Sequence, residues 1–285
     1  MTDILDVSFS CGGHAADMAG EGLKTVIRYY SRNTGIPSKR LTRAEALQHV
    51  QAGLTLAAVH EARRGDLVAS FTRDLGAQDA AYARSYASQT VGQPAGSAIY
   101  FAVDCDPTAS EIKANIVPYF QGVAAAFAAP TGEPAYDVGV YGSGATCDAV
   151  LTAGLAKYAW LAQSKGWSGY AAFHKSGRWA MEQGMPVTAG GVDGDPDTAN
   201  PNGAGFGAFT LAPAAVSLAP PKFVIARSGL RLRSGPGTEF ETRQVLPLGT
   251  KVFPLGDTQG WTQVDLQGDG AADGYVSSGF LADRI

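Results

Sequence analysis

The chain between Met1 and about Asp197 alternates between short apolar runs and helix-like segments. This alternation is typical of a parallel sheet that is built from repeated strand and helix units. Eight strand candidates are visible, and they centre on Leu5, Ile27, Ala58, Phe101, Val140, Leu161, Met181 and Val192. Eight such units close into a barrel, for which roughly 200 residues is the lower limit. We therefore predict an α/β fold with a (β/α)8 TIM-like barrel, in which some late connections are loops or single turns.

Two of the predicted helices begin with a capping signal. Thr42 precedes Glu45, and Thr108 precedes Glu111. In such a Thr-x-x-Glu capping box, the threonine hydroxyl and the glutamate carboxylate each accept a hydrogen bond from a backbone amide that the helix start leaves free. A helix is therefore expected to begin at each of these threonines.

A change of composition separates the barrel from the end of the chain. Residues 203–207 are rich in glycine, and residues 211–221 are rich in proline and alanine, as in an interdomain linker. Beyond them, residues 222–285 carry short alternating runs at close spacing, which favour a small all-β barrel. We predict a barrel domain over residues 1–210, a linker over 211–221 and a second, all-β domain over 222–285.

The charge balance and the start of the chain exclude several classes of partner. The 22 basic and 26 acidic side chains give a formal net charge of -4, which leaves no electrostatic footprint for nucleic acid or for an anionic membrane. Met1 leads almost directly into an apolar strand, without the basic segment, hydrophobic core or cleavage site of a secretory signal peptide. We expect synthesis in the cytoplasm, no nucleic-acid partner and no membrane association.

The cysteines and one acidic segment bear on metal binding. Cys11, Cys105 and Cys147 are odd in number, far apart and without Cys-x-x-Cys spacing, which argues against a disulfide framework or a structural zinc site. The segment from Asp193 to Asp197 holds three alternating carboxylates but lacks the glycine and the terminal glutamate of a calcium-binding loop. We predict no metal site and no cofactor.

Acidic side chains follow several of the apolar runs, where the strands of a barrel would end. The carboxyl ends of parallel barrel strands open onto one face, and barrel enzymes carry their chemistry on that face. The candidate catalytic residues are therefore Asp6, Glu61, Asp104, Asp106 and Asp193. Further residues near the same ends would bind a substrate, and these are Tyr29, Tyr141, Trp160, Gln183 and Asp195.

Strand geometry predicts which of these carboxylates meet. Residues two apart on a strand point to the same side, so Asp104 and Asp106 are expected to share a face. Closure of the barrel makes the first and eighth strands neighbours, which brings Asp6 beside Asp193 or Asp195. Crowded carboxylates raise one another's pKa, and we expect this effect to keep Asp104, Asp106 or Glu61 protonated near neutral pH.

The end of the chain resembles the bacterial SH3 family. The resemblance begins with the strand and turn from Gly229 to Thr238, and it continues in the family's order through Leu248 to Val252, Gly260-Trp261, Gly274 to Val276 and Phe280-Leu281. It covers the whole of the predicted all-β domain. The resemblance implies a small SH3-like barrel.

The first domain resembles a bacterial family of glycoside-hydrolase-like barrels that are distant relatives of the family 25 lysozymes. The segments that carry the resemblance span nearly the whole domain, and they are Leu5 to Ser8, Ile27 to Tyr30, His60-Glu61, Ile99 to Asp106, Gly139 to Ser143 and Val192-Asp193. The resemblance implies a barrel with a glycan-cleaving site at its mouth.

One departure from the lysozyme pattern concerns the fourth strand. The family 25 lysozymes have Asp-x-Glu there, whereas this chain has Asp104-Cys105-Asp106, which is one methylene shorter at the expected acid. Glycoside hydrolysis usually needs one carboxylic acid that protonates the leaving oxygen and a second carboxylate. Either Glu61 supplies the missing reach, or the aspartate pair orients a substrate N-acetyl group in a substrate-assisted mechanism. Both alternatives remain open.

Together these features predict a muramidase-like hydrolase that acts on peptidoglycan. The SH3-like domain would hold the enzyme on the cell wall, and without a secretory signal it would act at the cell envelope after lysis or specialised secretion. One alternative is a non-catalytic glycan-binding or envelope-scaffolding protein that keeps the barrel mouth as a lectin-like cleft. Another is an intracellular sugar-binding protein.

Overall fold

The computed structural model describes residues 3–61, 67–211, 220–266, 268, 270 and 272–284. The chain divides into two compact units, residues 1–211 and residues 212–285, and each unit is described by itself. Most of the predicted linker, residues 212–219, lies outside the described residues. Within the described part of the chain, no helix combines the length and the apolarity that crossing a membrane requires.

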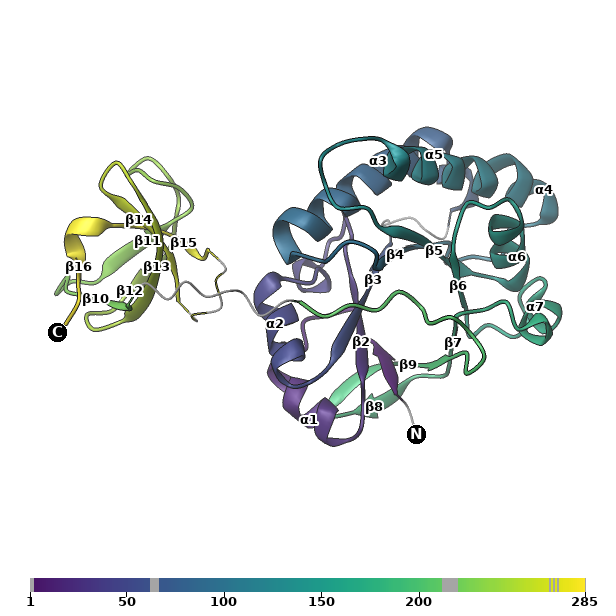
Figure 1. Cartoon of the computed structure of the whole chain (residues 1–285), viewed down its shortest axis with the longest axis horizontal. Helices are drawn as coiled ribbons and strands as arrows, with labels where there is room; N and C mark the ends of the chain where they lie inside the picture. The colour runs from purple at the N-terminus through teal and green to yellow at the C-terminus, as the bar shows by residue number, and fades with distance from the viewer. Residues whose placement is uncertain are drawn as a thin grey trace. The chain divides into compact units, whose positions relative to one another are not determined.

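The first unit is a barrel of eight strands that closes on itself (Figure 1). In ring order the strands are β1 (Ile4–Asp6), β2 (Thr25–Tyr29), β3 (Thr55–His60), β4 (Ala98–Ala102), β5 (Asp137–Gly142), β6 (Tyr158–Leu161), β7 (Met181–Gln183) and β9 (Val192–Ala199). Each of them contains the residue on which the corresponding predicted strand centres. Strand β8 (Val187–Ala189) pairs only with β9, beside the ring.

The barrel is mixed, so the predicted (β/α)8 arrangement is wrong in its last unit. Strands β1 to β7 run parallel to one another, but β9 pairs antiparallel with both β7 and β1. Eight residues, 184–191, connect β7 to β9. A parallel crossover needs a dozen residues or more, so a connection of this length reverses the chain instead. As a result, the beginning of β9, and not its end, lies at the carboxyl ends of the other strands.

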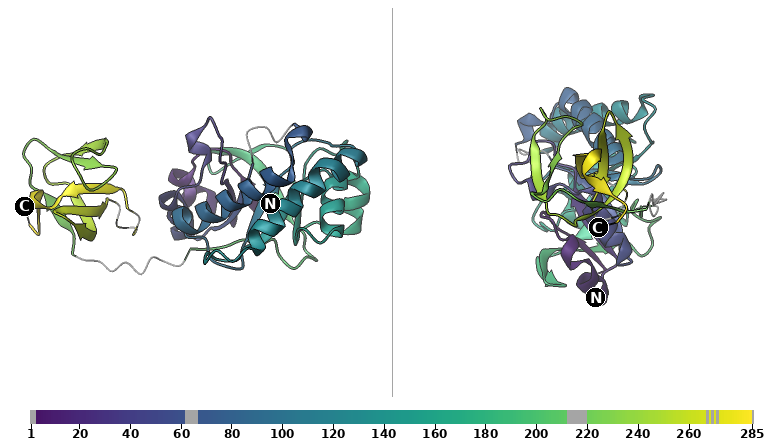
Figure 2. Two further views of the ribbon diagram at one scale, coloured as in Figure 1. Left: turned by 90° about the horizontal axis from the view of Figure 1, so that it is seen from above. Right: turned by 90° about the vertical axis from the view of Figure 1, so that its left-hand side faces the viewer.

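Helices cover the outside of the ring (Figures 1 and 2). They are α1 (Ala15–Gly20), α2 (Arg43–Gln51), α3 (Arg73–Ser85), α4 (Ala109–Glu111), α5 (Val117–Ala128), α6 (Gly144–Thr152) and α7 (Tyr170–Ser176). π-helical turns at Tyr86–Val91 and Ile112–Ile116 extend α3 and join α4 to α5. Helices α3 and α5 pack side by side against the outer face of the sheet.

The core has two layers because the barrel strands are buried on both faces. Outward-facing residues such as Val26 and Phe101 pack beneath the helices, and inward-facing residues such as Ile27 and Tyr100 fill the barrel. Gly139 on β5 makes room for the inner layer, because a Cβ there would lie 2.4 Å from the ring of Tyr100. The barrel is therefore packed with side chains below its mouth.

The second unit is a small antiparallel all-β domain. Its strands are β10 (Lys222–Val224), β11 (Leu230–Arg233), β12 (Thr242–Leu246), β13 (Lys251–Thr258), β14 (Trp261–Asp265), β15 (Gly274–Ser277) and β16 (Leu281–Ala282). They form one sheet in the order β12-β11-β15-β14-β13-β10-β16. On β11, the buried Leu230 and Leu232 alternate with Arg231 and Arg233, so one face packs on the core and the other carries the arginines.

Candidate functional site

A cavity of about 170 Å³ opens at the carboxyl ends of the parallel strands. Most of its lining residues are the last residues of a strand or lie within two residues of its end. They are Asp6, Tyr29, Val59, Glu61, Ala102, Asp104, Tyr141, Trp160, Gln163, Gln183 and Asp195. The described lining residues thus combine four carboxylates with three aromatic rings in a space suited to a small polar ligand.

Asp6 is the most deeply buried carboxylate of the cavity. It is the last residue of β1, and its side chain accepts hydrogen bonds from the Tyr29 hydroxyl at 2.9 Å and from Nε2 of Gln183 at 3.5 Å. Its other oxygen, Oδ1, is buried without a hydrogen-bond partner among the described residues. Across the closing strand pair, Asp6 lies opposite Asp195, as ring closure predicts.

This environment favours the protonated form of Asp6. Burial raises the pKa of Asp6 to about 7, and the negative charges of Asp195 and Glu61 act in the same direction. The hydrogen bond from Tyr29 and the positive charge of Lys39 oppose the shift, but they do not cancel it. Near neutral pH, Asp6 is therefore able to donate a proton to a bound ligand.

Glu61 pairs with a lysine that was not among the predicted site residues. Nζ of Lys39 lies 2.6 Å from Oε2 of Glu61, and the same ammonium group sits over the Tyr29 ring, 4.4 Å from its centroid. Lys39 belongs to a 3-10 turn at Pro37–Lys39 after β2. No pattern in the sequence connects this turn with the end of β3.

An aromatic wall completes the cavity. The Tyr141 and Trp160 rings meet edge to face with centroids 4.7 Å apart, and the Tyr141 hydroxyl donates to Oε1 of Gln183. Below them, Nε1 of Trp160 donates to Asp197 at 2.6 Å. Burial raises the pKa of Asp197 well above its ordinary value, and the charge of Asp6 adds to this. Asp197 was not among the predicted site residues, although its alternation with Asp195 places it on the same face of β9.

The other candidate carboxylates lie in different surroundings. Strand β4 ends at Ala102, so the alternation that would give Asp104 and Asp106 a common face does not extend to them. Asp104 lines the cavity, whereas Asp106 does not and accepts hydrogen bonds from the backbone and hydroxyl of Ser168. Asp193 is exposed and accepts a hydrogen bond from Thr188 of β8, also outside the cavity lining.

The structure therefore brings together eight of the ten predicted site residues. Asp6, Glu61 and Asp104 of the five catalytic candidates line the cavity, as do all five of the substrate-binding candidates. Val59, Ala102 and Gln163 line it as well, and they were not among the predicted site residues. Gln163 follows β6 by two residues, so the rule that strand ends meet at the mouth would have found it.

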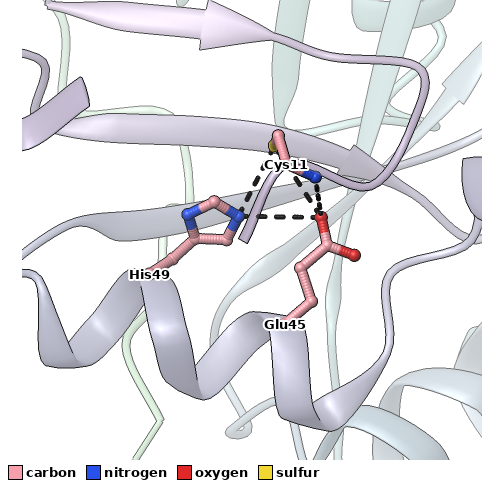
Figure 3. A group of neighbouring side chains, drawn as sticks. All are labelled: Cys11, Glu45 and His49. Atoms are coloured by element: carbon pink, nitrogen blue, oxygen red, sulfur yellow. Dashed lines mark hydrogen bonds and ion pairs between the residues drawn. The ribbon is translucent and has the colours of Figure 1, made fainter. Parts of the chain in front are cut away.

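A second cluster of reactive side chains, Cys11, Glu45 and His49, lies outside this cavity (Figure 3). Their potential ligand atoms all lie within 4.8 Å of one another, as a metal site would require. However, the Glu45 carboxylate already binds Nε of Arg28 at 2.8 Å and the backbone amide of Cys11 at 3.0 Å. A divalent cation would meet the positive charge of that guanidinium, so we interpret the cluster as a structural one.

The protonation states of this cluster agree with a structural role. Burial alone would raise the pKa of Glu45, but hydrogen bonds from His49 and Arg28 outweigh it and lower the pKa to about 2. Burial also raises the pKa of Cys11 to about 12, so this residue is a thiol and not a thiolate at neutral pH. The network ties the segment after β1 and the end of β2 to helix α2.

Both units match known protein families. Residues 16–197 match the family described as Rv2525c-like, glycoside hydrolase-like domain, and residues 228–282 match the bacterial SH3 domain. The uncharacterized proteins YbfG and FadG of Bacillus subtilis (strain 168) are 34% and 28% identical over 188 and 182 residues, in each case 63% of this chain. These matches take in only 25% and 31% of the relatives' own lengths.

Among solved structures, the barrel is similar to the Mycobacterium tuberculosis Tat-secreted protein Rv2525c in complex with L-tartrate. The two share 22% sequence identity with a TM-score of 0.57, and the match covers 72% of this chain and 97% of that one. This likeness shows a common fold. The family match extends over more than half of the chain. The chain therefore belongs to the Rv2525c-like glycoside hydrolase-like family, and it carries a bacterial SH3 domain after its barrel.

Proposed function

We propose that this protein is a muramidase-like glycoside hydrolase that acts on the glycan strands of bacterial peptidoglycan. The observation that carries the proposal is the mouth cavity, in which a carboxyl group with a pKa of about 7 lies beside other carboxylates and an aromatic wall. Glycoside hydrolysis usually needs such an unequal pair, one acid that protonates the leaving oxygen and one carboxylate that stays ionised. The glycoside hydrolase-like family supports the same class of substrate.

In this proposal Asp6 is the general acid. The second carboxylate is Asp104 or Glu61, because both line the cavity. The ion pair between Glu61 and Lys39 favours Asp104 as the second carboxylate, since Glu61 would have to leave Lys39 to reach a sugar carbon. Tyr141 and Trp160 would hold the sugar ring, and Gln183 and Asp195 would bind its hydroxyl groups.

The SH3 domain would keep the enzyme on its polymeric substrate. A groove of about 350 Å³ on this domain is lined by Arg231, Arg233, Trp261 and Phe280, among others. Such a surface offers cations and apolar area to a wall component, and weak binding through a linked module prolongs residence on a polymer. Action at the cell envelope, after lysis or specialised secretion, is part of this proposal.

A specific observation favours a second candidate function, a non-catalytic glycan-binding protein. Asp106 stands where the family 25 lysozymes have a glutamate, but it binds Ser168 and does not line the cavity. With this acid turned away, the cavity would serve as a lectin-like cleft. Cleavage and binding then have to be measured side by side.

The test compares the wild-type chain with Asp6→Asn on purified peptidoglycan. The matched control is Asp137→Asn, which makes the same change at the opposite end of β5, where Asp137 pairs with Lys157. We expect wild type and Asp137→Asn to release reducing ends, and Asp6→Asn to lose about 10²- to 10⁴-fold in rate. An inert wild type that still co-sediments with peptidoglycan would favour the binding protein, and equal rates for all three variants would exclude Asp6 as the acid.

A further inference from the structure

A second, larger cavity adjoins the mouth cavity. Its volume is about 570 Å³, more than three times that of the first, and its lining includes Lys165, Glu182, Met185 and Thr198. Gln163 and Gln183 line both cavities. The two spaces therefore meet along these glutamine side chains, close to Asp6, to which Nε2 of Gln183 donates a hydrogen bond.

The charges of the second cavity are not balanced. Among the described residues that line it, Glu182 is the only carboxylate. Glu182 already has two partners, because it lies 3.1 Å from Nε2 of His174 and accepts a hydrogen bond from the Tyr170 hydroxyl. Lys165 is exposed, and its ammonium group has no hydrogen bond or ion pair with any residue that the structure describes. The cavity thus presents one uncommitted cation to a ligand.

The remaining lining suits a sugar that carries a substituent. The side chains of Gln163 and Thr198 offer hydrogen-bond donors and acceptors, and Met185 is 73% exposed, which is unusual for a large apolar side chain. A sugar ring has polar edges and an apolar face. A polar rim, an exposed apolar side chain and a single cation match an amino sugar that bears a carboxylate.

We infer that Lys165 selects glycan strands whose sugars carry an acidic substituent. The inference rests on the proposed function, because it places one sugar in the mouth cavity and its neighbour across Gln163 and Gln183, with the carboxylate of the neighbour beside Lys165. Neutral polymers of amino sugars would fill the same two cavities without this contact. The second cavity then sets the preference between acidic and neutral strands.

The experiment measures binding and reducing-end release with two forms of one substrate. The first form is peptide-free glycan strands prepared from peptidoglycan, in which alternate sugars keep their lactyl carboxylates, and the second is the same strands after amidation of those carboxylates. The full-length chain is compared with Lys165→Gln, with the conservative Lys165→Arg, and with Lys175→Gln as a matched control. Lys175 is an exposed lysine of α7 outside the lining of the second cavity.

We expect Lys165→Gln to bind the carboxylated strands about fivefold more weakly than wild type does, and to bind the amidated strands unchanged. Lys165→Arg should keep most of the preference, and Lys175→Gln should keep all of it. An equal effect of Lys165→Gln on both forms, or no effect on either, would overturn the inference while leaving the proposed function in place. If wild type neither binds nor cleaves either form, the proposed function fails and the inference fails with it.

Discussion

At the scale of single residues, Asp6 combines deep burial with a neighbouring carboxylate, and both favour its protonated form. The meeting of Asp6 with Asp195 could be predicted, because it follows from the closure of eight strands into a ring. The crowding of carboxylates predicts a raised pKa for Asp104, Asp106 or Glu61, whereas burial raises the pKa of Asp6 on β1. How deeply a side chain lies beneath the mouth could not be predicted from the sequence. Lys39 was beyond prediction as well, because it reaches Glu61 from an irregular turn.

The raised pKa of Asp6 makes the stability of the barrel depend on pH. The folded state holds the proton more tightly than the unfolded chain, so the stabilisation is complete below about pH 4 and is lost as the pH rises through about 7. The gap between about 7 and the ordinary value of 3.8 corresponds to about 4 kcal/mol. Urea unfolding at a series of pH values should show Asp6→Asn gaining stability relative to wild type over this range.

Asp137 is half-exposed and pairs with Lys157, so Asp137→Asn should track wild type across the series. If the unfolding free energies of wild type and Asp6→Asn stay parallel from pH 4 to pH 8, the pKa of the Asp6 carboxyl is not raised.

Asp104 and Asp106 are expected to respond differently to the same substitution. Asp104→Asn removes a carboxylate from the cavity and should lower the rate of glycan cleavage about 100-fold or more. Asp106→Asn replaces one of the two oxygens that accept hydrogen bonds from Ser168 by an NH2 group, and it should lower Tm by about 2–4 °C with little effect on the rate. Reducing-end assays and thermal unfolding of both variants check this. A larger loss of rate in Asp106→Asn than in Asp104→Asn would contradict it and would favour Asp104 and Asp106 as a lysozyme-like catalytic pair.

At the scale of elements, the apolar runs of the sequence predicted where the strands lie along the chain, but they did not predict the direction of the last strand. The alternation of apolar runs marks a strand whichever way it points, whereas direction depends on the length of the connection, here the eight residues between β7 and β9. Near the start of β9, Asp195 still reaches the mouth, because an antiparallel strand begins where its neighbours end, whereas Asp193 lies outside the cavity lining. Asp195 therefore lies in the cavity, although β9 runs in the direction opposite to the predicted one.

The two predicted capping boxes show how packing overrides a local signal. At Thr108 the box is complete, with the hydroxyl and the Glu111 carboxylate both accepting backbone hydrogen bonds. At Thr42 the hydroxyl caps α2, but the Glu45 side chain pairs with Arg28 instead of returning to the cap. A buried guanidinium is a stronger partner than a backbone amide that water can reach.

The Arg28 network should therefore matter more to stability than the complete capping box. Arg28 also donates to the carbonyl oxygens of Ser38 and Lys39, so it fixes the turn that presents Lys39 to Glu61. Glu45→Gln leaves the buried guanidinium without its counter-charge and should cost about 3–5 kcal/mol. Thr108→Ala should cost about 1 kcal/mol. Urea unfolding of the two variants measures the difference, and equal losses would contradict the structural role of the network.

At the scale of the whole molecule, the chain joins a barrel with a polar cavity to an SH3 domain with a cationic, aromatic groove. Both units could be recognised from the sequence, because their motifs recur in a fixed order. The cavity itself is a product of packing. Its size depends on how far Tyr100 and Trp160 fill the barrel from below, which no pattern of residues in the sequence specifies.

If the SH3 domain is a tether, a change in its groove should alter retention on the wall without altering the chemical step. Arg231→Gln should lower co-sedimentation with intact peptidoglycan about threefold, because Arg231 lines the groove and has no ion pair within the described part of the chain. Turnover of soluble glycan strands should stay unchanged. Arg284→Gln is the control, since Arg284 is exposed and outside the groove lining. Unaltered sedimentation of Arg231→Gln would argue against a tether at this groove.

If the mouth of the barrel cleaves glycans with Asp6 as its acid, the rate of cleavage should depend on pH. A general acid works only while it is protonated, so the initial rate of reducing-end release from peptidoglycan should fall as the pH rises through about 7. The small residual rate of Asp6→Asn should lack this fall. A wild-type rate that stays level between pH 6 and pH 9, or an Asp6→Asn variant as active as wild type, would contradict the claim.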